Sequence, residues 1–194
     1  MELKVSAILL AAGFSSRMNG RDKLLLPYKG RPLLEWAVAL LESLPCQEKI
    51  LVATQARLAQ TPIPSGVLAV ANAHPEIGQS ESLRLGVNAA GGDGYFFLNA
   101  DQPRLTLAAL SPMLDLIRAN AGKIIYPVVG GHPCTPVFFP SRFRDELLMQ
   151  TGDAGGRAVR AAHPEACLPW KASPPTAFAD IDSQEDYAAL RDDL

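Results

Sequence analysis

The sequence predicts an α/β fold with a mostly parallel central sheet and helices on both of its faces. Short apolar runs alternate with segments of helical periodicity, which is the pattern of βαβ units. The first run is almost continuously apolar, as expected of a strand that helices cover on both faces. A length of 194 residues with 48% hydrophobic and 20% charged residues fits one globular domain that spans residues 1–194.

In the first half of the chain, strand-like runs alternate with helical segments. Val5–Leu10 is apolar apart from Ser6, which fits a buried first strand. The apolar residues of Arg31–Leu44 recur at helical spacing, and Pro32 near the start suits the first turn of a helix. By the same periodicities, the expected elements that follow are the strands Ile50–Ala53, Val67–Val70 and Tyr95–Leu98 and the helix Ser80–Ala90.

In the second half, the helix expected over Thr106–Asn120 contains a proline. Ser111 can cap a helix start and Pro112 suits the first turn after it, so we expect a break at this point. Ser183 can likewise cap a last helix. The remaining expected elements are the strands Ile124–Val129, Val137–Phe139 and Ala177–Ile181 and short helices over Arg142–Met149 and Gly156–Ala162.

The charge balance and the cysteines narrow the class of protein. There are 18 Lys and Arg against 20 Asp and Glu, a net charge of −2, so we expect neither a nucleic acid nor a membrane as partner. No apolar run reaches the ~20 residues of a spanning helix. Met1–Gly13 superficially resembles a signal peptide, but it also fits a buried first strand. Cys46, Cys134 and Cys167 lack the spacing of a zinc site or a disulfide framework, so we expect a reduced, cytoplasmic protein.

In a parallel α/β sheet, ligands bind at the carboxyl ends of the strands, and the unusual residues of this chain follow expected strands. The first such segment is Leu10–Pro27. Its small residues Ala11–Gly13 allow backbone amides to approach a ligand closely, and Arg17 and Lys23 supply positive charge suited to a polyphosphate. The Walker A and G-x-G-x-x-G patterns are missing. A surface loop with two solvated cations explains the same residues.

Two further segments supply carboxylates. Asp101 follows the expected strand Tyr95–Leu98, where it can share Mg²⁺ with phosphate oxygens; a turn that merely ends the strand is the alternative. Asp180 and Asp182 end another expected strand, on which side chains two residues apart point the same way. We favour Asp182 as the second metal ligand because it lies nearer the carboxyl end. A capped helix start at Ser183 is the alternative explanation.

The segment Gly78–Arg84 opens an expected helix with two serines. Ser80 and Ser82 can cap the helix, and its amide end can receive an anion or a base edge. The segment is also a near miss to the G-x-S-x-G nucleophile elbow, with Ser82 in place of the last glycine. Because 194 residues is small for that hydrolase fold, a nucleophilic Ser80 is not favoured.

These segments carry longer motifs in a fixed order. Leu10–Lys23 matches L-A-A-G-x-S-x-R-M-G-x-x-K, Gly78–Gly86 matches G-x-x-x-S-L-x-x-G, and Asp101–Pro103 is D-Q-P. Gly152–Arg157 matches G-D-A-G-x-R, and Asp180–Asp186 matches D-I-D-T-P-E-D. Together the motifs resemble the MobA-like nucleotidyltransferase family, and more closely its molybdenum cofactor cytidylyltransferase branch. The resemblance covers nearly the whole chain.

The chain departs from the family pattern at several positions. Asn19 follows Met18 where glycine is usual, and Lys23 comes one residue late, so the reach of this lysine is an open point. Ala100 stands where glycine usually precedes the metal-binding aspartate. Departures within Gly130–Phe139 leave the acceptor open.

The resemblance implies a three-layer, Rossmann-like nucleotidyltransferase fold. It implies transfer of a nucleoside monophosphate to a phosphorylated acceptor with release of pyrophosphate, with CTP favoured over GTP, molybdopterin as acceptor and Mg²⁺ as cofactor. Arg17, Lys23 and Asp101 would be catalytic, and Asp182 would join Asp101 on the metal. The implied nucleotide-binding residues are Leu10, Ala11, Ala12, Gly13, Lys23, Ser80, Ser82 and Asp101.

Two alternatives stay open at this point. Because the opening loop and Ala100 depart from the family pattern, the protein could be a nucleotide-binding module that has lost catalysis. An enzyme of the same type could also act on a sugar phosphate or another phosphorylated alcohol. Release of pyrophosphate in the presence of Mg²⁺ and an acceptor separates an enzyme from a binding module.

Overall fold

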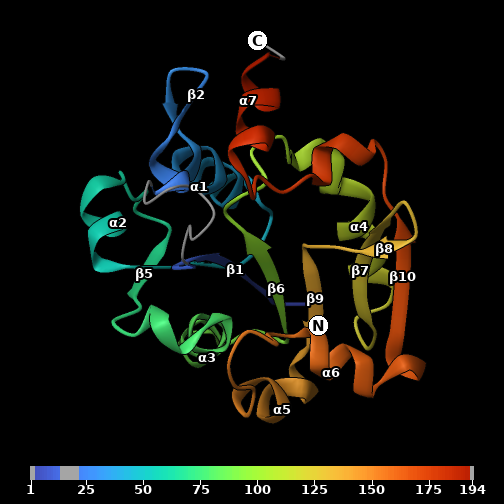
Figure 1. The fold of residues 1–194 in the computed structure, drawn as a ribbon. Coiled ribbons are helices and arrows are strands. Elements are labelled where there is room, and N and C mark those ends of the chain that lie inside the picture. The colour runs from blue at the N-terminus through green and yellow to red at the C-terminus, as the bar shows by residue number, and fades with distance from the viewer. Residues whose placement is uncertain (1–2, 14–21, 193–194) are drawn as a thin grey trace.

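A mixed eight-stranded sheet lies at the centre of the computed structural model, which describes residues 3–13 and 22–192 (Figure 1). The strands are β1 (Val5–Ala11), β4 (Glu48–Ala53), β5 (Leu68–Ala71), β6 (Gly94–Asn99), β7 (Ile124–Val129), β8 (His132–Pro133), β9 (Val137–Pro140) and β10 (Cys167–Lys171). Their order is β10-β7-β9-β6-β1-β4-β5, and β8 pairs with β7. Strand β9 runs antiparallel between β6 and β7, whereas β1, β4, β5 and β6 are mutually parallel and β10 is parallel to β7.

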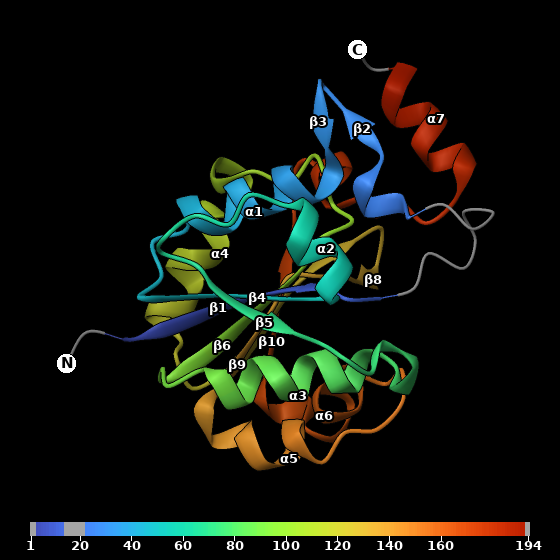
Figure 2. The same cartoon turned by 90° about the vertical axis from the view of Figure 1, so that its left-hand side faces the viewer.

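Helices cover both faces of this sheet, which gives three layers (Figure 2). One face carries α1 (Leu33–Ser43), α2 (Gln55–Gln60) and α4 (Leu107–Ala119). The other face carries α3 (Gln79–Ala89), α5 (Arg144–Leu148) and α6 (Arg157–Ala162). The expected α/β fold with a mostly parallel sheet is confirmed.

The central strands contribute side chains to two separate hydrophobic cores. Along β1, Leu9 belongs to the core shared with α1 and α4, and Ile8 to the core shared with α3. Along β4, Leu51 likewise belongs to the core shared with α1 and α4, and Ile50 to the core shared with α3. Successive side chains of a strand point to opposite faces, so a strand buried on both faces is apolar at every position. This is why Val5–Leu10 lacks the alternation of a half-exposed strand.

The last helix, α7 (Gln184–Asp192), begins at the expected cap. The Ser183 hydroxyl oxygen accepts the N–H of Asp186 at 3.1 Å, and the Asp186 carboxylate accepts the N–H of Ser183 at 2.8 Å. Such reciprocal bonds form a capping box, which satisfies N–H groups that the first helical turn leaves without partners. The box also fixes the start of α7 directly after Asp182.

Helix α7 packs beside the hairpin formed by β2 (Pro27–Tyr28) and β3 (Arg31–Pro32) (Figure 1). Ile181 and Leu190 share a small core with Tyr28 and Leu33. This core joins the C-terminal helix to the chain that follows the opening loop, so two segments far apart in sequence are held at one end of the sheet.

The strand expected over residues 177–181 is wrong. A 3-10 helix covers Pro175–Phe178, and the chain then runs without regular structure to α7. Pro175 suits the first turn of a helix, and the N–H of Ala177 donates to the Pro174 carbonyl at 3.1 Å, so the start of the expected strand is part of a helical turn. The edge strand is β10 instead, which the sequence-based prediction missed. Its exposed Pro169 argues against a central strand but is tolerated at a sheet edge.

The break expected at Ser111 and Pro112 is also wrong, because α4 continues through both residues. The helix starts at Thr106, whose hydroxyl accepts the N–H of Ala109 at 3.2 Å. Pro112 deprives the Ala108 carbonyl of its helical donor, but both residues are exposed and water can bind there. The helix is held on the sheet by its buried face, which consists of Leu110, Met113, Leu114 and Ile117.

Across the described residues, no helix combines the length and the apolar character needed to cross a membrane.

Candidate active site

A cavity of about 570 Å³ opens at the carboxyl ends of β1 and β6. The two strands are parallel neighbours, with Leu10 paired in register with Asn99. Ligands bind at this edge of open α/β sheets. Most of the site residues predicted from the sequence line the cavity, namely Leu10, Ala11, Ala12, Gly13, Lys23, Ser82, Asp101 and Asp182. The predicted Arg17 lies outside the described residues.

The end of β1 forms one wall of the cavity. Ala11 and Ala12 are almost fully buried, yet both belong to the lining. Among the described residues, no heavy atom lies within 4 Å of the position that a Cβ atom would take at Gly13. The small side chains thus leave the backbone of the turn accessible to a ligand.

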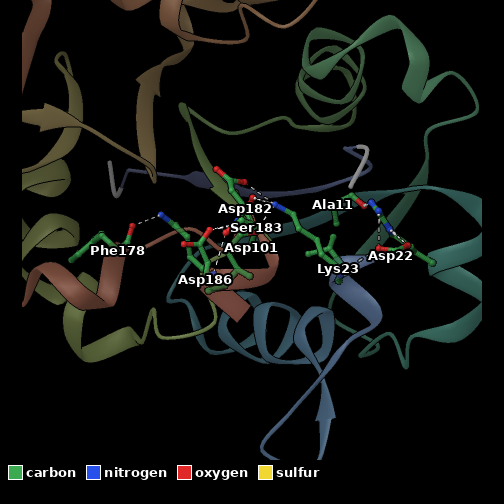
Figure 3. Close-up of polar contacts among 12 residues, drawn as sticks. Ala11, Asp22, Lys23, Asp101, Phe178, Asp182, Ser183 and Asp186 are labelled. Carbon is green, nitrogen blue, oxygen red and sulfur yellow. Dashed lines mark hydrogen bonds and ion pairs between the residues drawn. The ribbon is translucent and has the colours of Figure 1, made fainter. Parts of the chain in front are cut away.

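Lys23 connects the two predicted carboxylates (Figure 3). Its ammonium donates hydrogen bonds to Asp101 Oδ2 at 2.8 Å, to the Ile181 carbonyl at 2.8 Å and to Asp182 Oδ1 at 3.0 Å. The N–H of Ile181 donates in turn to the Asp101 carbonyl at 2.9 Å. The longer opening loop therefore does not keep Lys23 from the site.

The two carboxylates keep the Lys23 ammonium charged. Burial lowers the pKa of Lys23, but attraction and hydrogen bonding to Asp101 and then to Asp182 outweigh it, so the net shift of this pKa is upward. The site thus holds a permanent positive charge between two negative ones. A lysine in this position can exchange carboxylate for phosphate oxygens without changing its protonation state.

The donor set fits a magnesium ion. Asp101 Oδ1 is buried and has no hydrogen-bond partner in the described part of the structure. Asp182 contributes a second carboxylate, which is paired with the same Lys23 ammonium as Asp101. Among the residues that the structure describes, no group of three or more His, Cys, Asp or Glu side chains forms a metal cage. Mg²⁺ needs no such cage, because it is bound through one or two carboxylates together with substrate phosphates.

The amide end of α3 is not open to an anion, which corrects one expectation for this segment. The N–H of Ser80 donates to the Gly152 carbonyl at 2.9 Å, and the N–H of Gln79 donates to Asp153 Oδ1 at 3.3 Å. The helix begins after Gly78, without a side-chain cap, so neither serine caps it. With φ of +105° and a Cβ position only 2.8 Å from the Gly152 carbonyl oxygen, Gly78 allows this close approach.

The two predicted serines lie in different surroundings. Ser82 lines the cavity, and its hydroxyl oxygen accepts a hydrogen bond from the Asn72 amide at 3.0 Å. Ser80 is 2% exposed and lies outside the lining of the cavity. Ser80 instead holds the start of α3 against Gly152 through its backbone N–H.

A second cavity of about 470 Å³ adjoins the first. The two share Asp101 and Asp182, together with Leu10, Gln79 and Asn99. Arg157 and Arg160 of α6 line the second cavity, as do the apolar side chains Leu83, Phe97, Val137 and Phe139. It therefore offers cationic and apolar surface next to the two carboxylates.

Asp180 lines the second cavity and not the first. Removal of water by the surrounding protein, followed by repulsion from Asp101 and Asp182, raises the pKa of Asp180 to about 7. The residue is nevertheless exposed at the molecular surface, where solvent weakens such repulsion. Asp180 thus takes up a proton more readily than a free aspartate does.

Sequence reasoning assigned no role to Asn99 and Arg160, which line the cavities, or to Arg57, which contacts the end of β1 beside them. Asn99 lines both cavities, and its place as a polar residue at the end of a buried strand is a signal that could have found it. Arg57 belongs to α2, a helix that was not expected, and contacts Ala11 and Asp22. No local pattern marks Arg57, because its partners lie far away in the sequence.

The fold and site define an α/β protein with a ligand cavity at the carboxyl edge of its sheet and a lysine that bridges two carboxylates there. The chain belongs to the family of MobA-like NTP transferase domains, whose family model matches residues 7–167.

The chain is also similar to individual proteins. The molybdenum cofactor guanylyltransferase of Xanthomonas euvesicatoria pv. vesicatoria is 34% identical over 110 residues, which cover 56% of this chain and 53% of that protein. The chain thus spans about half the length of this relative. The purine catabolism protein PucB of Bacillus subtilis is 30% identical over 95% of this chain and 94% of its own. The crystal structure of Rv0371c from Mycobacterium tuberculosis is 23% identical with a TM-score of 0.79, and the match covers 99% of both chains.

Proposed function

We propose that this protein transfers a nucleoside monophosphate from a nucleoside triphosphate to a phosphorylated acceptor and releases pyrophosphate. The observation that carries the proposal is the meeting of two cavities at Asp101 and Asp182, with Lys23 bonded to both carboxylates. A donor in one cavity and an acceptor in the other would bring their reacting groups together at this shared edge. Such catalysis depends on positioning and electrostatics and needs no protein nucleophile.

The first cavity is the proposed donor site. The accessible backbone of Ala11–Gly13 suits close contact with the nucleotide, and Ser82 lies where it can contact the base or ribose. Lys23, together with Arg17, would stabilise the charge that builds up on the departing pyrophosphate. An acceptor oxygen attacks the α-phosphorus, the bond from that phosphorus to the bridging oxygen breaks, and the electron pair leaves with pyrophosphate.

Asp101 and Asp182 are the proposed ligands of Mg²⁺, which when bound would neutralise phosphate oxygens as a Lewis acid. Asp101 Oδ1 can accept this role without losing a hydrogen bond, because it has no partner among the described residues. Lys23 now occupies the facing oxygens of both carboxylates. In the loaded enzyme we place its ammonium on the phosphates instead.

We propose CTP as the donor, with GTP as the second candidate. CTP is favoured by the resemblance of Leu24–Pro27, Ser82–Leu83 and Gly152–Gly155 to the cytidylyltransferase branch. GTP is favoured by the guanylyltransferase name of the Xanthomonas relative. Both nucleotides carry the same triphosphate, so the choice depends on the wall of the cavity that receives the base.

The second cavity is the proposed acceptor site. Arg157 and Arg160 can bind a phosphate group, for which guanidinium groups are well suited, and the apolar wall can receive a ring system. The resemblance and the name of the Xanthomonas relative favour molybdopterin. Another phosphorylated alcohol remains the alternative, since any phosphomonoester presents the same attacking oxygen.

A thermal-shift panel of nucleoside triphosphates with and without Mg²⁺ tests the donor site. A ligand at ~100 times its Kd should add about 2.7 kcal/mol to the free energy of unfolding. We expect Mg²⁺ to enlarge the stabilisation by CTP or GTP in the wild type and to do little in Asp101→Asn. The nucleotide with the larger shift identifies the base. Absence of stabilisation by every triphosphate contradicts the proposal.

A nucleotide-binding module without catalysis is the rival from another class. It would pass the thermal-shift test but would release no pyrophosphate when Mg²⁺ and a phosphorylated acceptor are added. Steady pyrophosphate release that depends on the acceptor and is lost in Asp101→Asn separates the enzyme from this rival.

A further inference from the structure

Helix α2 buries a charged residue where an apolar one would be expected. Arg57 is 5% exposed and is the only buried residue of this short helix. Burying a guanidinium costs free energy unless it is paired and hydrogen-bonded. An apolar side chain could anchor the helix without this cost, so the contacts of Arg57 indicate what the charge does.

The Arg57 side chain joins the two described segments that flank residues 14–21. Its Nε and Nη2 donate to Asp22 Oδ2 at 2.7 Å and to Asp22 Oδ1 at 2.9 Å, and its Nη1 donates to the Ala11 carbonyl at 2.6 Å. The first two bonds form a two-pronged guanidinium–carboxylate pair, which fixes direction as well as distance. Arg57 therefore sets the position of Asp22 relative to the end of β1.

Asp22 passes this constraint to Lys23. Its Oδ1 also accepts the N–H of Leu24 at 3.1 Å, and its carbonyl accepts the N–H of Leu25 at 3.1 Å, so Asp22 caps the short 3-10 helix Lys23–Leu25. The backbone of Lys23 lies inside this capped turn. Its side chain reaches the paired carboxylates from there.

The bond to Ala11 orients the other side of the donor site. In a trans peptide the carbonyl and the following N–H point in opposite directions. With the Ala11 carbonyl held on Arg57, the N–H of Ala12 points away from Arg57. Ala11 and Ala12 line the cavity and Arg57 does not. This geometry places the N–H of Ala12 on the side of the turn opposite Arg57.

We propose that Arg57 is a positioning residue of the donor site, which acts through Asp22 on Lys23 and through the Ala11 carbonyl on the Ala11–Gly13 turn. The inference rests on the proposed function, because it takes the first cavity as the site of a triphosphate. Arg57 lines neither cavity, so it would act on the ligand only through other residues. It orders in advance the two groups that meet the phosphates, and such ordering strengthens binding by reducing its entropic cost.

The test compares Arg57→Met, Arg57→Lys and the control Arg118→Met, which removes an exposed ion pair with Asp115 on α4. The Kd values of the chosen triphosphate and of its monophosphate are measured by calorimetry with Mg²⁺, well below the melting temperature of each variant. We expect Arg57→Met to weaken triphosphate binding about tenfold or more and monophosphate binding clearly less. Arg57→Lys, which keeps the charge but not the two-pronged geometry, should lie between it and the wild type, and the control should match the wild type.

A purely structural Arg57 gives a different result. Its variants would have a lower melting temperature but, measured below it, the same Kd for the triphosphate as the wild type. Alternatively, they would bind the triphosphate and the monophosphate equally more weakly. Either outcome overturns the inference. If Arg57→Met does not fold, Asp22→Asn and Arg57→Lys carry the same comparison. A wild type that binds no triphosphate refutes the proposed function, and this inference with it. If the wild type binds the triphosphate and Arg57→Met binds it with the same Kd, the inference is refuted and the proposed function is not.

Discussion

At the scale of single residues, the site is built around one ammonium that two carboxylates share. Lys23 bonds Asp101 and Asp182 with similar distances, while Asp101 Oδ1 stays without a partner among the described residues. This pairing neutralises charges that would otherwise repel each other across the cavity. A metal ion and Lys23 would therefore use the same two carboxylates, and on Asp101 they would use different oxygens, Oδ1 for the metal and Oδ2 for Lys23.

Removing the lysine should affect the outer phosphates most. Lys23→Ala is expected to weaken triphosphate binding more than monophosphate binding, because the lost charge serves the phosphates that leave as pyrophosphate. Calorimetric titration with both nucleotides measures the difference. Lys171→Ala, which removes an exposed lysine on β10, is the control. Equal weakening for the two nucleotides would place Lys23 elsewhere.

The two candidate carboxylates of the C-terminal segment should differ in their metal requirement. Asp182 lies 3.0 Å from the Lys23 ammonium and lines both cavities, whereas Asp180 lines only the second. Asp182→Ala should therefore raise the Mg²⁺ concentration needed for pyrophosphate release, and Asp180→Ala should not. A shifted requirement in the Asp180 variant alone would reverse the assignment. A shift in neither variant would leave the segment with a structural role only.

At the scale of elements, the sequence predicted the parallel core of the sheet and the loops at its carboxyl edge. Val5–Leu10 and Tyr95–Leu98 are read correctly because burial on both faces leaves a continuous apolar run. The failures occur where tertiary contacts decide the structure. Phe178 is buried in the main core but as part of a 3-10 helix, so an apolar run was mistaken for a strand. The pairing of Lys23 with both carboxylates joins residues distant in sequence, and no local pattern encodes that distance.

The proline inside α4 provides a stability test at this scale. Pro112→Ala restores the N–H that the Ala108 carbonyl lacks and removes the clash of the proline ring, while it raises the entropy of the unfolded chain. We expect the free energy of unfolding to rise by about 1 to 2 kcal/mol. Chemical denaturation measures it, with the neighbouring Ser111→Ala as control. A lower stability would show that the proline suits a distortion of the helix.

The contact between α5 and α6 should depend on pH. His163 at the end of α6 lies 2.7 Å from the Glu146 carboxylate of α5, and this hydrogen bond raises the pKa of His163 above its ordinary value. The folded protein therefore binds the proton more tightly than the unfolded chain does. The resulting stabilisation is complete below about pH 6.5, the unfolded value, and is lost as the pH rises through the higher folded pKa.

His163→Gln should remove this dependence. The melting temperature of the wild type should exceed that of the variant by most in mild acid, and the difference should shrink as the solution becomes alkaline. Glu146→Gln should reduce the same pH-dependent part, and the remainder belongs to Glu165, which lies 3.4 Å from His163 Nδ1. A difference that stays constant with pH would assign the effect of His163 to its packing against Phe143.

At the scale of the whole molecule, the fold places two adjoining cavities on one edge of a sheet. The end of β1 and the start of α3 contribute to the first cavity, while α6 and the chain before β9 contribute to the second. Under the proposed function, the donor half and the acceptor half of the transfer reaction can then be altered independently. Asp101 and Asp182 are the residues at which changes to one half should affect the other.

Substitution of Arg160 should weaken binding of the acceptor without weakening binding of the triphosphate donor. Arg160 lines the second cavity, and its guanidinium lies 4.6 Å from the centre of the Tyr126 ring. Arg160→Met should raise the KM for the acceptor and leave the Kd of the triphosphate unchanged. Arg142→Met is a matched control, because it also removes a guanidinium stacked on an aromatic ring, Phe143, but lies in neither cavity. Weaker triphosphate binding in Arg160→Met would contradict the division into two sites.

The central claim is that this edge of the sheet transfers a nucleotide to a phosphorylated acceptor. It is tested most directly by following the label from triphosphate marked at the α-phosphorus or at the γ-phosphorus, with Mg²⁺ and molybdopterin present. The account predicts that the α-label appears in the acceptor and the γ-label in pyrophosphate, both at rates lost in Asp101→Asn. An α-label that stays in the triphosphate, or a γ-label that appears as free phosphate, would contradict it.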